Sequence, residues 1–397
     1  MKYSLKGAFF SGLVFPGLGQ IILKHYKRGS VLIVIVSVSM LVFVIKAVQQ
    51  ALAILEKIQS EGGVLTMSAI TDAATRVTTA SDSMILKFLL LLILLLWIIG
   101  IVDAYRIGRK KDIENRLASQ ASQRCECWKQ QMDEGFGFME SILKYPVEEC
   151  FEELTSLRNA VDEAKIEVVF SGTQIVPGLD RQFYLRAGLI PCFLAAAREM
   201  NDRGMILKVE DGYRSRAMQK ELALKQTIFD TVVSRVVWEH NGQAPPFSSI
   251  RKRLGVLIAW CPKVGTHMSG SAIDISVLNH DTGEEVDRGA PYLELSELTP
   301  MSSPFIDQRC RSNRDMITSL MRRHGFIAYP YEFWHYSSGD AFAELLLSSG
   351  KPGRYGPVHR DTATNTITVI ENPSEPLNTD NEIAERIEQA LKQLQEG

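Results

Sequence analysis

Residues 84–102 form an almost uninterrupted apolar stretch, and this stretch restricts the possible folds of the chain more than any other feature. It contains a single charged residue, Lys87, and lacks the polar stripe that a soluble amphipathic helix needs. As a helix, its 19 residues would span about 28 Å, close to the hydrocarbon thickness of a bilayer. A second uncharged stretch, rich in Val, Ile and Leu, covers residues 29–45. Together they predict a transmembrane hairpin over residues 29–105, with helices at about 29–49 and 84–104.

A third apolar segment, nearer the N-terminus, differs from these two. Residues 7–23 carry no charge, but Pro16 and Gly17 interrupt them. Since proline and glycine break a helix, we expect residues 1–28 to form a short segment that is re-entrant or interfacial. Three buried soluble helices are an alternative, which the missing polar stripe disfavours. A cleaved signal peptide is disfavoured because two more apolar segments follow the first.

Basic residues predict the orientation of the hairpin. Residues 24–28 contain three Lys or Arg side chains, and a basic cluster at 106–111 follows the last apolar segment. In the connection over residues 47–83, the only Lys or Arg residues are Lys57 and Arg76. By the positive-inside rule, both ends of the hairpin lie in the cytoplasm at the inner membrane, and so does the large C-terminal part. The lipid bilayer is therefore one expected partner.

Length and charge limit the remaining classes of function. A chain of 397 residues is expected to hold two or three structural units. Its 44 basic and 46 acidic residues leave a formal net charge of −2, so no overall basic field favours a nucleic-acid partner. The sequence does not identify a protein partner either.

The C-terminal part has the composition of a globular domain with a preceding linker. Residues 106–150 are charged and compatible with a helix, which indicates a juxtamembrane helix and linker. Residues 151–360 mix helical patterns with short alternating strands, without strict βα repetition. This mixture predicts an α+β domain with an antiparallel sheet and flanking helices. Residues 361–397 would form a tail with an amphipathic helix, which either packs on the domain or contacts a partner.

Two short motifs carry the residues with the clearest chemistry. The stretch GTHMSGSAIDIS contains His267 and Asp274, and YEFWHY contains Glu332 and His335. Imidazole and carboxylate groups are good zinc ligands, and a set of three leaves one tetrahedral position open, as in catalytic zinc sites. A carboxylate near the open position could transfer protons, and Glu332 lies three residues before one candidate ligand.

The local pattern around these residues supports their convergence. Alternation in SAIDIS puts Asp274 on the strand face opposite Ile273 and Ile275. Gly270 would let the chain turn between His267 and this strand. Glu332 and His335 are an odd number of residues apart and would face opposite ways in a regular strand. We therefore expect a turn, bulge or helical twist between them.

Arg214 is a further candidate because it follows a predicted strand in EDGYRSRAMQ. A guanidinium stays protonated and donates paired hydrogen bonds. If its side chain points into the site, Arg214 could polarise a scissile carbonyl and stabilise an oxyanion.

In this order, the motifs GYRS, H-x-x-G-x-A-x-D and E-x-W-H-Y resemble those of the D-alanyl-D-alanine dipeptidases of the vancomycin-resistance type. These are zinc peptidases related in fold to muramoyl-pentapeptide carboxypeptidases and hedgehog signalling domains, and the resemblance covers roughly residues 180–345. It implies one zinc ion per chain, a general base and acid, and a residue that stabilises the transition state. Carried over by position, the ligands would be His267, Asp274 and His335, the base Glu332 and the stabilising residue Arg214.

The sequence departs from this family where substrate would bind. The family usually has Ser two residues before the first histidine, where this chain has Gly265, and Thr266 would supply the hydroxyl instead. The family places an Asp directly after a Phe to bind the substrate ammonium, whereas here Asp307 follows Phe305 by two residues. The aromatic residue of the last motif is kept as Trp334. Thr266, Asp307 and Trp334 are thus the expected substrate-binding residues.

Three functions follow from these expectations. The first is a membrane-anchored zinc dipeptidase that hydrolyses D-Ala-D-Ala or a related small dipeptide. The second is a D,D- or L,D-carboxypeptidase that trims peptidoglycan stem peptides, which requires the site to lie outside the cytoplasm. The third is a zinc-bearing sensor or scaffold without catalysis.

Overall fold

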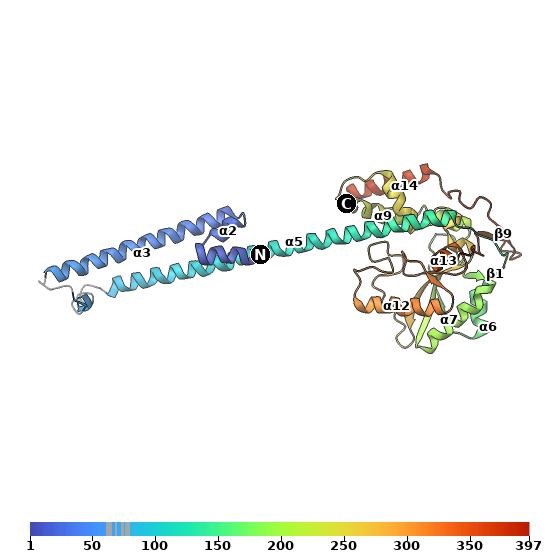
Figure 1. The fold of residues 1–397 in the computed structure, drawn as a ribbon, viewed down its shortest axis with the longest axis horizontal. Helices are drawn as coiled ribbons and strands as arrows, with labels where there is room; N and C mark the ends of the chain where they lie inside the picture. Colours follow the sequence, from blue (N-terminus) through green and yellow to red (C-terminus); the bar gives the residue numbers. More distant parts are fainter. Residues whose placement is uncertain (61–65, 68–69, 73–74, 76–79, 397) are drawn as a thin grey trace. The chain divides into compact units, whose positions relative to one another are not determined.

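The computed structural model describes residues 1–60, 66–67, 70–72, 75 and 80–396. The chain divides into two compact units, Met1–Ser122 and Gln123–Gly397 (Figure 1). The first unit contains the apolar segments, and the second contains the mixed helices and strands.

In the first unit, the N-terminal segment is a broken helical hairpin. Helix α1 (Tyr3–Phe9) continues into a π-helical turn, η1 (Phe10–Val14), and α2 (Leu18–Ile22) follows after a break. Gly17 lies at this break with a φ of 102°, which only glycine adopts readily. The predicted interruption of the segment is therefore confirmed.

Two long helices cover the other apolar stretches. Helix α3 (Tyr26–Ser60) and helix α5 (Ala80–Lys144) are long and apolar enough to cross a membrane. Only 11% and 6% of their most apolar windows are buried within the protein, so most of this apolar surface is exposed. Both predicted helices are present and extend beyond their predicted ends. Part of the predicted outer loop lies outside the described residues.

Polar side chains join the broken hairpin to α5. Gln20 is buried, and its Nε2 donates to the carbonyl of Gly100 at 2.9 Å and to Asp103 Oδ2 at 3.1 Å. The Ser11 hydroxyl donates to Gln20 Oε1 at 2.9 Å. Hydrogen bonds among apolar helices are costly to leave unmade, so these bonds hold the segment in place.

The second unit is built on a five-stranded sheet, in the order β2-β4-β5-β7-β6. The strands are β2 (Val168–Phe170), β4 (Met205–Asp211), β5 (Ala272–Asn279), β6 (Ile327–Ala328) and β7 (His335–Ser337). Three of the pairings are antiparallel, which agrees with the predicted α+β fold. The β2–β4 pair is parallel, because the connection through helix α7 (Ile190–Asp202) returns the chain in the same direction.

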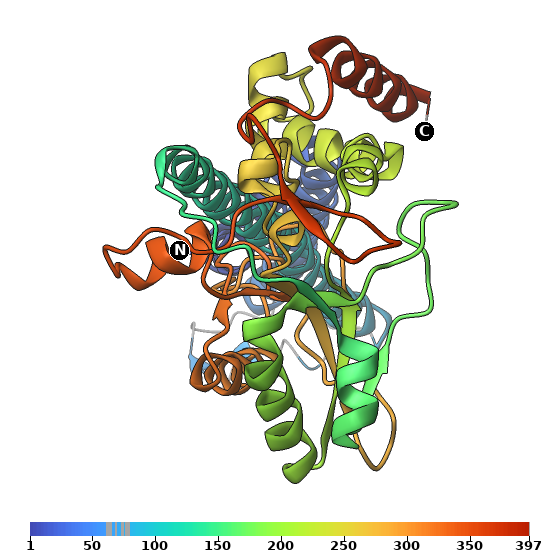
Figure 2. The same ribbon diagram turned by 90° about the vertical axis from the view of Figure 1, so that its right-hand side faces the viewer.

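One face of the sheet is covered by three helices, α6 (Leu157–Ala164), α7 and α12 (Gln308–Arg323) (Figure 2). Ile273 and Ile275 of β5 are fully buried in this core, together with Phe193 and Leu320. The other helices are α8 (Arg216–Leu222), α9 (Gln226–Glu239), α10 (Phe247–Leu257), α11 (Thr266–Ser269), α13 (Ala341–Leu347) and α14 (Asp380–Glu396), with short turns η2 (Ala187–Leu189) and η3 (Pro262–Val264). Two small antiparallel ribbons pair β1 (Leu154–Ser156) with β3 (Tyr184–Arg186), and β8 (Val358–Arg360) with β9 (Ile367–Val369).

The domain begins earlier in the chain than the sequence predicts. Residues 123–144 of α5 lie in the second unit, where Trp128 and Met132 are fully buried in a core shared with α9 and α10. Met139 and Ile142 are buried in a second cluster. These apolar residues lie at helical spacing among charged ones, so this part of the predicted linker is an amphipathic helix of the domain.

The C-terminal tail also packs on the domain. Residues 361–397 contain β9, which completes a hairpin with β8, and α14, which lies beside α9. Ile387 and Ala390 of α14 are buried in the same core as α9. The packing alternative for this helix is therefore confirmed.

Candidate metal centre

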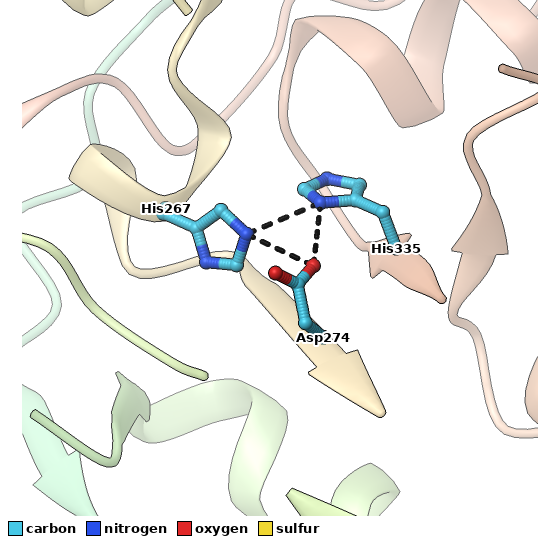
Figure 3. Close-up of side chains that lie close together, drawn as sticks. All are labelled: His267, Asp274 and His335. Carbon is cyan, nitrogen blue, oxygen red and sulfur yellow. Dashed lines mark hydrogen bonds and ion pairs between the residues drawn. The ribbon is translucent and has the colours of Figure 1, made fainter. Parts of the chain in front are cut away.

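Three side chains that are distant in sequence meet in one cluster (Figure 3). Its member Asp274 alternates along β5 with Ile273 and Ile275, so it lies on the face of the sheet opposite the core that α7 covers. His267 Nε2 lies 3.1 Å from Asp274 Oδ1 and 3.2 Å from His335 Nδ1. His335 Nδ1 lies 3.0 Å from the same Asp274 oxygen. All three side chains are buried. The predicted convergence is thus present.

Strand pairing and one glycine explain this meeting. Asp274 of β5 and His335 of β7 are directly paired in register, so their side chains share one face. His267 lies in α11, the short helix just before β5. Gly270 ends that helix with a φ of 67°, and a Cβ there would overlap Leu154. The predicted turn at Gly270 is confirmed.

Each imidazole uses its second nitrogen to hold its orientation. His267 Nδ1 lies 2.7 Å from the carbonyl of Gly212, to which it donates a hydrogen bond when Nε2 carries the lone pair. His335 Nε2 lies 2.9 Å from Thr266 Oγ1. Thr266 thus contacts a candidate ligand and also lines the cavity, and its expected contact with substrate stays a prediction.

The second oxygen of Asp274 is held by two donors. Arg214 Nη2 donates to Asp274 Oδ2 at 3.1 Å, and the Tyr292 hydroxyl donates to it at 3.0 Å. With Oδ2 occupied in this way, only Oδ1 faces the two imidazoles. Sequence reasoning missed Tyr292, since a tyrosine in a loop before α12 shows no pattern that marks it as a site residue.

Arg214 is buried and lines the cavity, as predicted. Its Nε donates to Asp211 Oδ2 at 2.7 Å and its Nη1 to Gln219 Oε1 at 3.3 Å. Together with the bond to Asp274, three of its five N–H groups are used, and two remain for a substrate.

Glu332 faces the same cavity from the turn before β7. The His335 amide donates to the Glu332 carbonyl at 3.2 Å, which is the predicted turn between them. The cavity has a volume of about 310 Å³ and is lined by the three clustered residues, Arg214, Glu332 and Trp334, together with apolar side chains. Trp334 is buried and lines this cavity, and its expected contact with substrate stays a prediction.

Asp307 does not reach this cavity. Its carboxylate caps α12 by accepting a hydrogen bond from the Cys310 amide at 2.8 Å, and its side chain is exposed. Ile306 takes the buried position instead. Because the carboxylate is shifted by one residue, it points to solvent, and the expected role of Asp307 in binding substrate lacks support.

Burial sets the protonation of the site. It lowers the pKa of His267, as does the nearby charge of Arg214, so this imidazole stays neutral at neutral pH. Burial alone would raise the pKa of Asp274, but interactions with His267 and His335 hold that pKa well below its ordinary value. Burial, followed by the charge of Asp274, raises the pKa of Glu332 well above its ordinary value. The site therefore combines one stable carboxylate with one that takes up protons readily.

The donor set fits a zinc ion. Ligand atoms 2.0–2.1 Å from a tetrahedral zinc lie about 3.3 Å from one another, close to the separations of the three donor atoms here. Two imidazoles and one carboxylate are ordinary zinc ligands, and hydrogen bonds to the far side of each ligand are typical of such sites.

Comparison with known proteins agrees with this geometry. Residues 194–349 match the model of the family Peptidase_M15, described as D-ala-D-ala dipeptidase. This stretch is a Peptidase_M15 domain. It contains all three clustered residues as well as Arg214 and Glu332.

Curated relatives of the M15 domain include D-alanyl-D-alanine dipeptidases. The protein of Enterococcus faecium is 37% identical over 75 residues, which cover 19% of this chain and 37% of that one. The protein of Synechocystis sp. is 33% identical over 88 residues, which cover 19% of this chain and 34% of that one. The chain therefore matches little more than a third of the length of these relatives.

Among solved structures, the LD-carboxypeptidase LdcB is 18% identical, with a TM-score of 0.28, over 51% of this chain and 77% of that one. VanYB in complex with D-alanine-D-alanine is 16% identical, with a TM-score of 0.27, over 46% of this chain and 97% of that one.

Proposed function

We propose that the second unit is a zinc-dependent peptidase that hydrolyses D-Ala-D-Ala or a related small dipeptide. The observation that carries the proposal is the meeting of His267, Asp274 and His335 beside Glu332 in one cavity. The M15 match to this part of the chain supports it.

His267, Asp274 and His335 would hold one zinc ion, which when bound supplies a Lewis acid and lowers the pKa of a bound water from 15.7 to about 7. Glu332 would accept the proton of the attacking water and deliver it to the leaving amine. Its raised pKa suits this double role, because a carboxyl group that titrates nearer neutral pH both accepts and donates.

Arg214 would hold the scissile carbonyl. Its two remaining N–H groups can donate to the carbonyl oxygen and to the oxyanion that forms from it. Its other three N–H groups are bound to Asp211, Gln219 and Asp274, so the guanidinium is already oriented. Loss of such an oriented donor typically raises the barrier by about 2.7–4 kcal/mol.

A carboxypeptidase is the second candidate, and the position of Asp307 favours it. A dipeptidase must bind a free substrate ammonium, yet Asp307 caps α12. Among the described residues that line the cavity, the only carboxylates are Asp274 and Glu332. A peptide with an acylated N-terminus would need no further carboxylate, as in D,D- or L,D-cleavage of peptidoglycan stems.

For location, we propose that α3 and α5 anchor the protein in a membrane with the peptidase in the cytoplasm, based on the basic residues that flank the hairpin. A carboxypeptidase acting on mature wall would need the opposite orientation. Reporters fused to the C-terminus, one active only in the cytoplasm and one only outside it, distinguish the two.

The deciding experiment uses the full chain purified in detergent. Its zinc content is measured, and release of D-alanine is followed from D-Ala-D-Ala and from an N-acylated peptide ending in D-Ala-D-Ala. We expect about one zinc per chain, hydrolysis that a chelator abolishes, and loss of hydrolysis in Glu332→Gln. The exposed Glu388→Gln is the matched control. A zinc-loaded, folded protein that cleaves no D,D- or L,D-peptide would contradict the proposal and favour a scaffold.

A further inference from the structure

The wall of the cavity holds one charged side chain that the proposed chemistry does not use. Among the described residues, its lysine and arginine side chains are Arg214 and Lys225. Arg214 is bound to the carboxylates of Asp211 and Asp274. Much of its charge is therefore balanced by these two aspartates, and Lys225 remains.

Lys225 directly precedes α9 and is half-buried. Its Nζ donates to the carbonyl of Ile175 at 3.1 Å, and Ile175 lines the same cavity. An ammonium has three donors. In the part of the chain that the structure describes, no carboxylate forms an ion pair with it within 4.0 Å.

Many lysines simply extend their charged end into water while the stem covers apolar surface. The surroundings of Lys225 differ, because it lines a cavity that is also lined by the apolar side chains of Leu222 and Ile228 and by the metal cluster. A half-buried ammonium in such a wall attracts an anion more strongly than a fully exposed one, since less water screens it.

We propose that Lys225 is a specificity-determining residue that binds a carboxylate of the substrate away from the scissile carbonyl. This inference rests on the proposed peptidase function and deepens it. The ligand is an anionic peptide, and its carboxylate is either the C-terminal one or that of an acidic side chain. Arg214 would act at the reacting carbonyl, and Lys225 would select the peptide that is placed there.

The test measures binding, so that it does not depend on turnover. The full, zinc-loaded chain carrying Glu332→Gln is titrated by calorimetry with three peptides that end in D-Ala-D-Ala. One has both a side-chain and a C-terminal carboxylate, one has the side chain as an amide, and one has the C-terminus as an amide. Each titration is repeated with Lys225→Met, which keeps the length of the stem.

A hydrogen-bonded charge pair of this kind corresponds to about a tenfold change in affinity. We therefore expect Lys225→Met to weaken binding of the fully acidic peptide about tenfold and to leave one of the two amides unaffected. The unaffected amide identifies the carboxylate that Lys225 contacts. Lys220→Met, whose side chain pairs with Glu382 outside the cavity, should leave all three affinities unchanged.

The role of Lys225 would be overturned by an equal loss of affinity for all three peptides, by no loss of affinity for any of them, or by no binding at all. The proposed peptidase function is judged separately, by release of D-alanine from the unmodified protein. The zinc content and melting temperature of Lys225→Met must match those of the parent protein. The charge reversal Lys225→Glu should weaken binding of the fully acidic peptide further than Lys225→Met does.

Discussion

Replacing Tyr292 with phenylalanine removes one of the two donors that hold Asp274 Oδ2. The phenol donates at 3.0 Å, and the remaining donor, Arg214 Nη2, lies at 3.1 Å. Burial, and then the charge of Asp274, raises the pKa of Tyr292 well above its ordinary value, so the phenol keeps its proton and donates throughout the working range. The variant therefore loses one hydrogen bond to a charged group and almost no volume.

The size of the effect follows from these contacts. A hydrogen bond to a charged group contributes about 1.5–3 kcal/mol. Because Arg214 still holds the same oxygen, we expect the lower end of this range, which is roughly a tenfold loss of zinc affinity. Without the phenol, the carboxylate is freer to rotate away from the position in which only Oδ1 faces the imidazoles.

The assay is competition for zinc between the full chain and a chromophoric chelator of known affinity, with circular dichroism as the check of fold. Tyr184→Phe is the matched control, since its ring packs on Arg360 and not on the metal cluster. An unchanged zinc affinity in Tyr292→Phe, with the fold intact, would refute the argument that the second oxygen of Asp274 must be held.

Further predictions concern catalysis, pH and stability. Glu332→Gln should keep its zinc and lose about 10²–10⁴-fold in kcat. The base acts as a carboxylate, and the pKa of Glu332 is raised above its ordinary value of 4.5. The kcat/KM of the unmodified protein should therefore be high at higher pH and fall on acidification at a pH above 4.5. A fall at or below pH 4.5 would contradict the assignment of Glu332 as the base. Gly270→Ala should destabilise the fold by more than about 1 kcal/mol in urea unfolding, because its φ is positive and a Cβ would overlap Leu154. Asp307→Ala should lower stability by about 1 kcal/mol through loss of the α12 cap, and leave KM unchanged; a large rise in KM would restore its role in binding substrate.

The sequence by itself determined the local parts of the site. The alternation around Asp274, the need for Gly270 and the turn between Glu332 and His335 are properties of a few neighbouring residues, and all three are present. Side chains on a strand alternate, and glycine adopts positive φ more readily than other residues, so such features follow from short patterns.

Tertiary structure decided everything that depends on distant segments. Tyr292, from the loop between β5 and α12, donates to Asp274, and Asp307 caps α12 while Ile306 takes the buried position. Residues 123–144 join the domain because α9 and α10 cover their apolar stripe. Such contacts depend on which surfaces meet after folding. The residue types along the chain do not show which distant segments will meet.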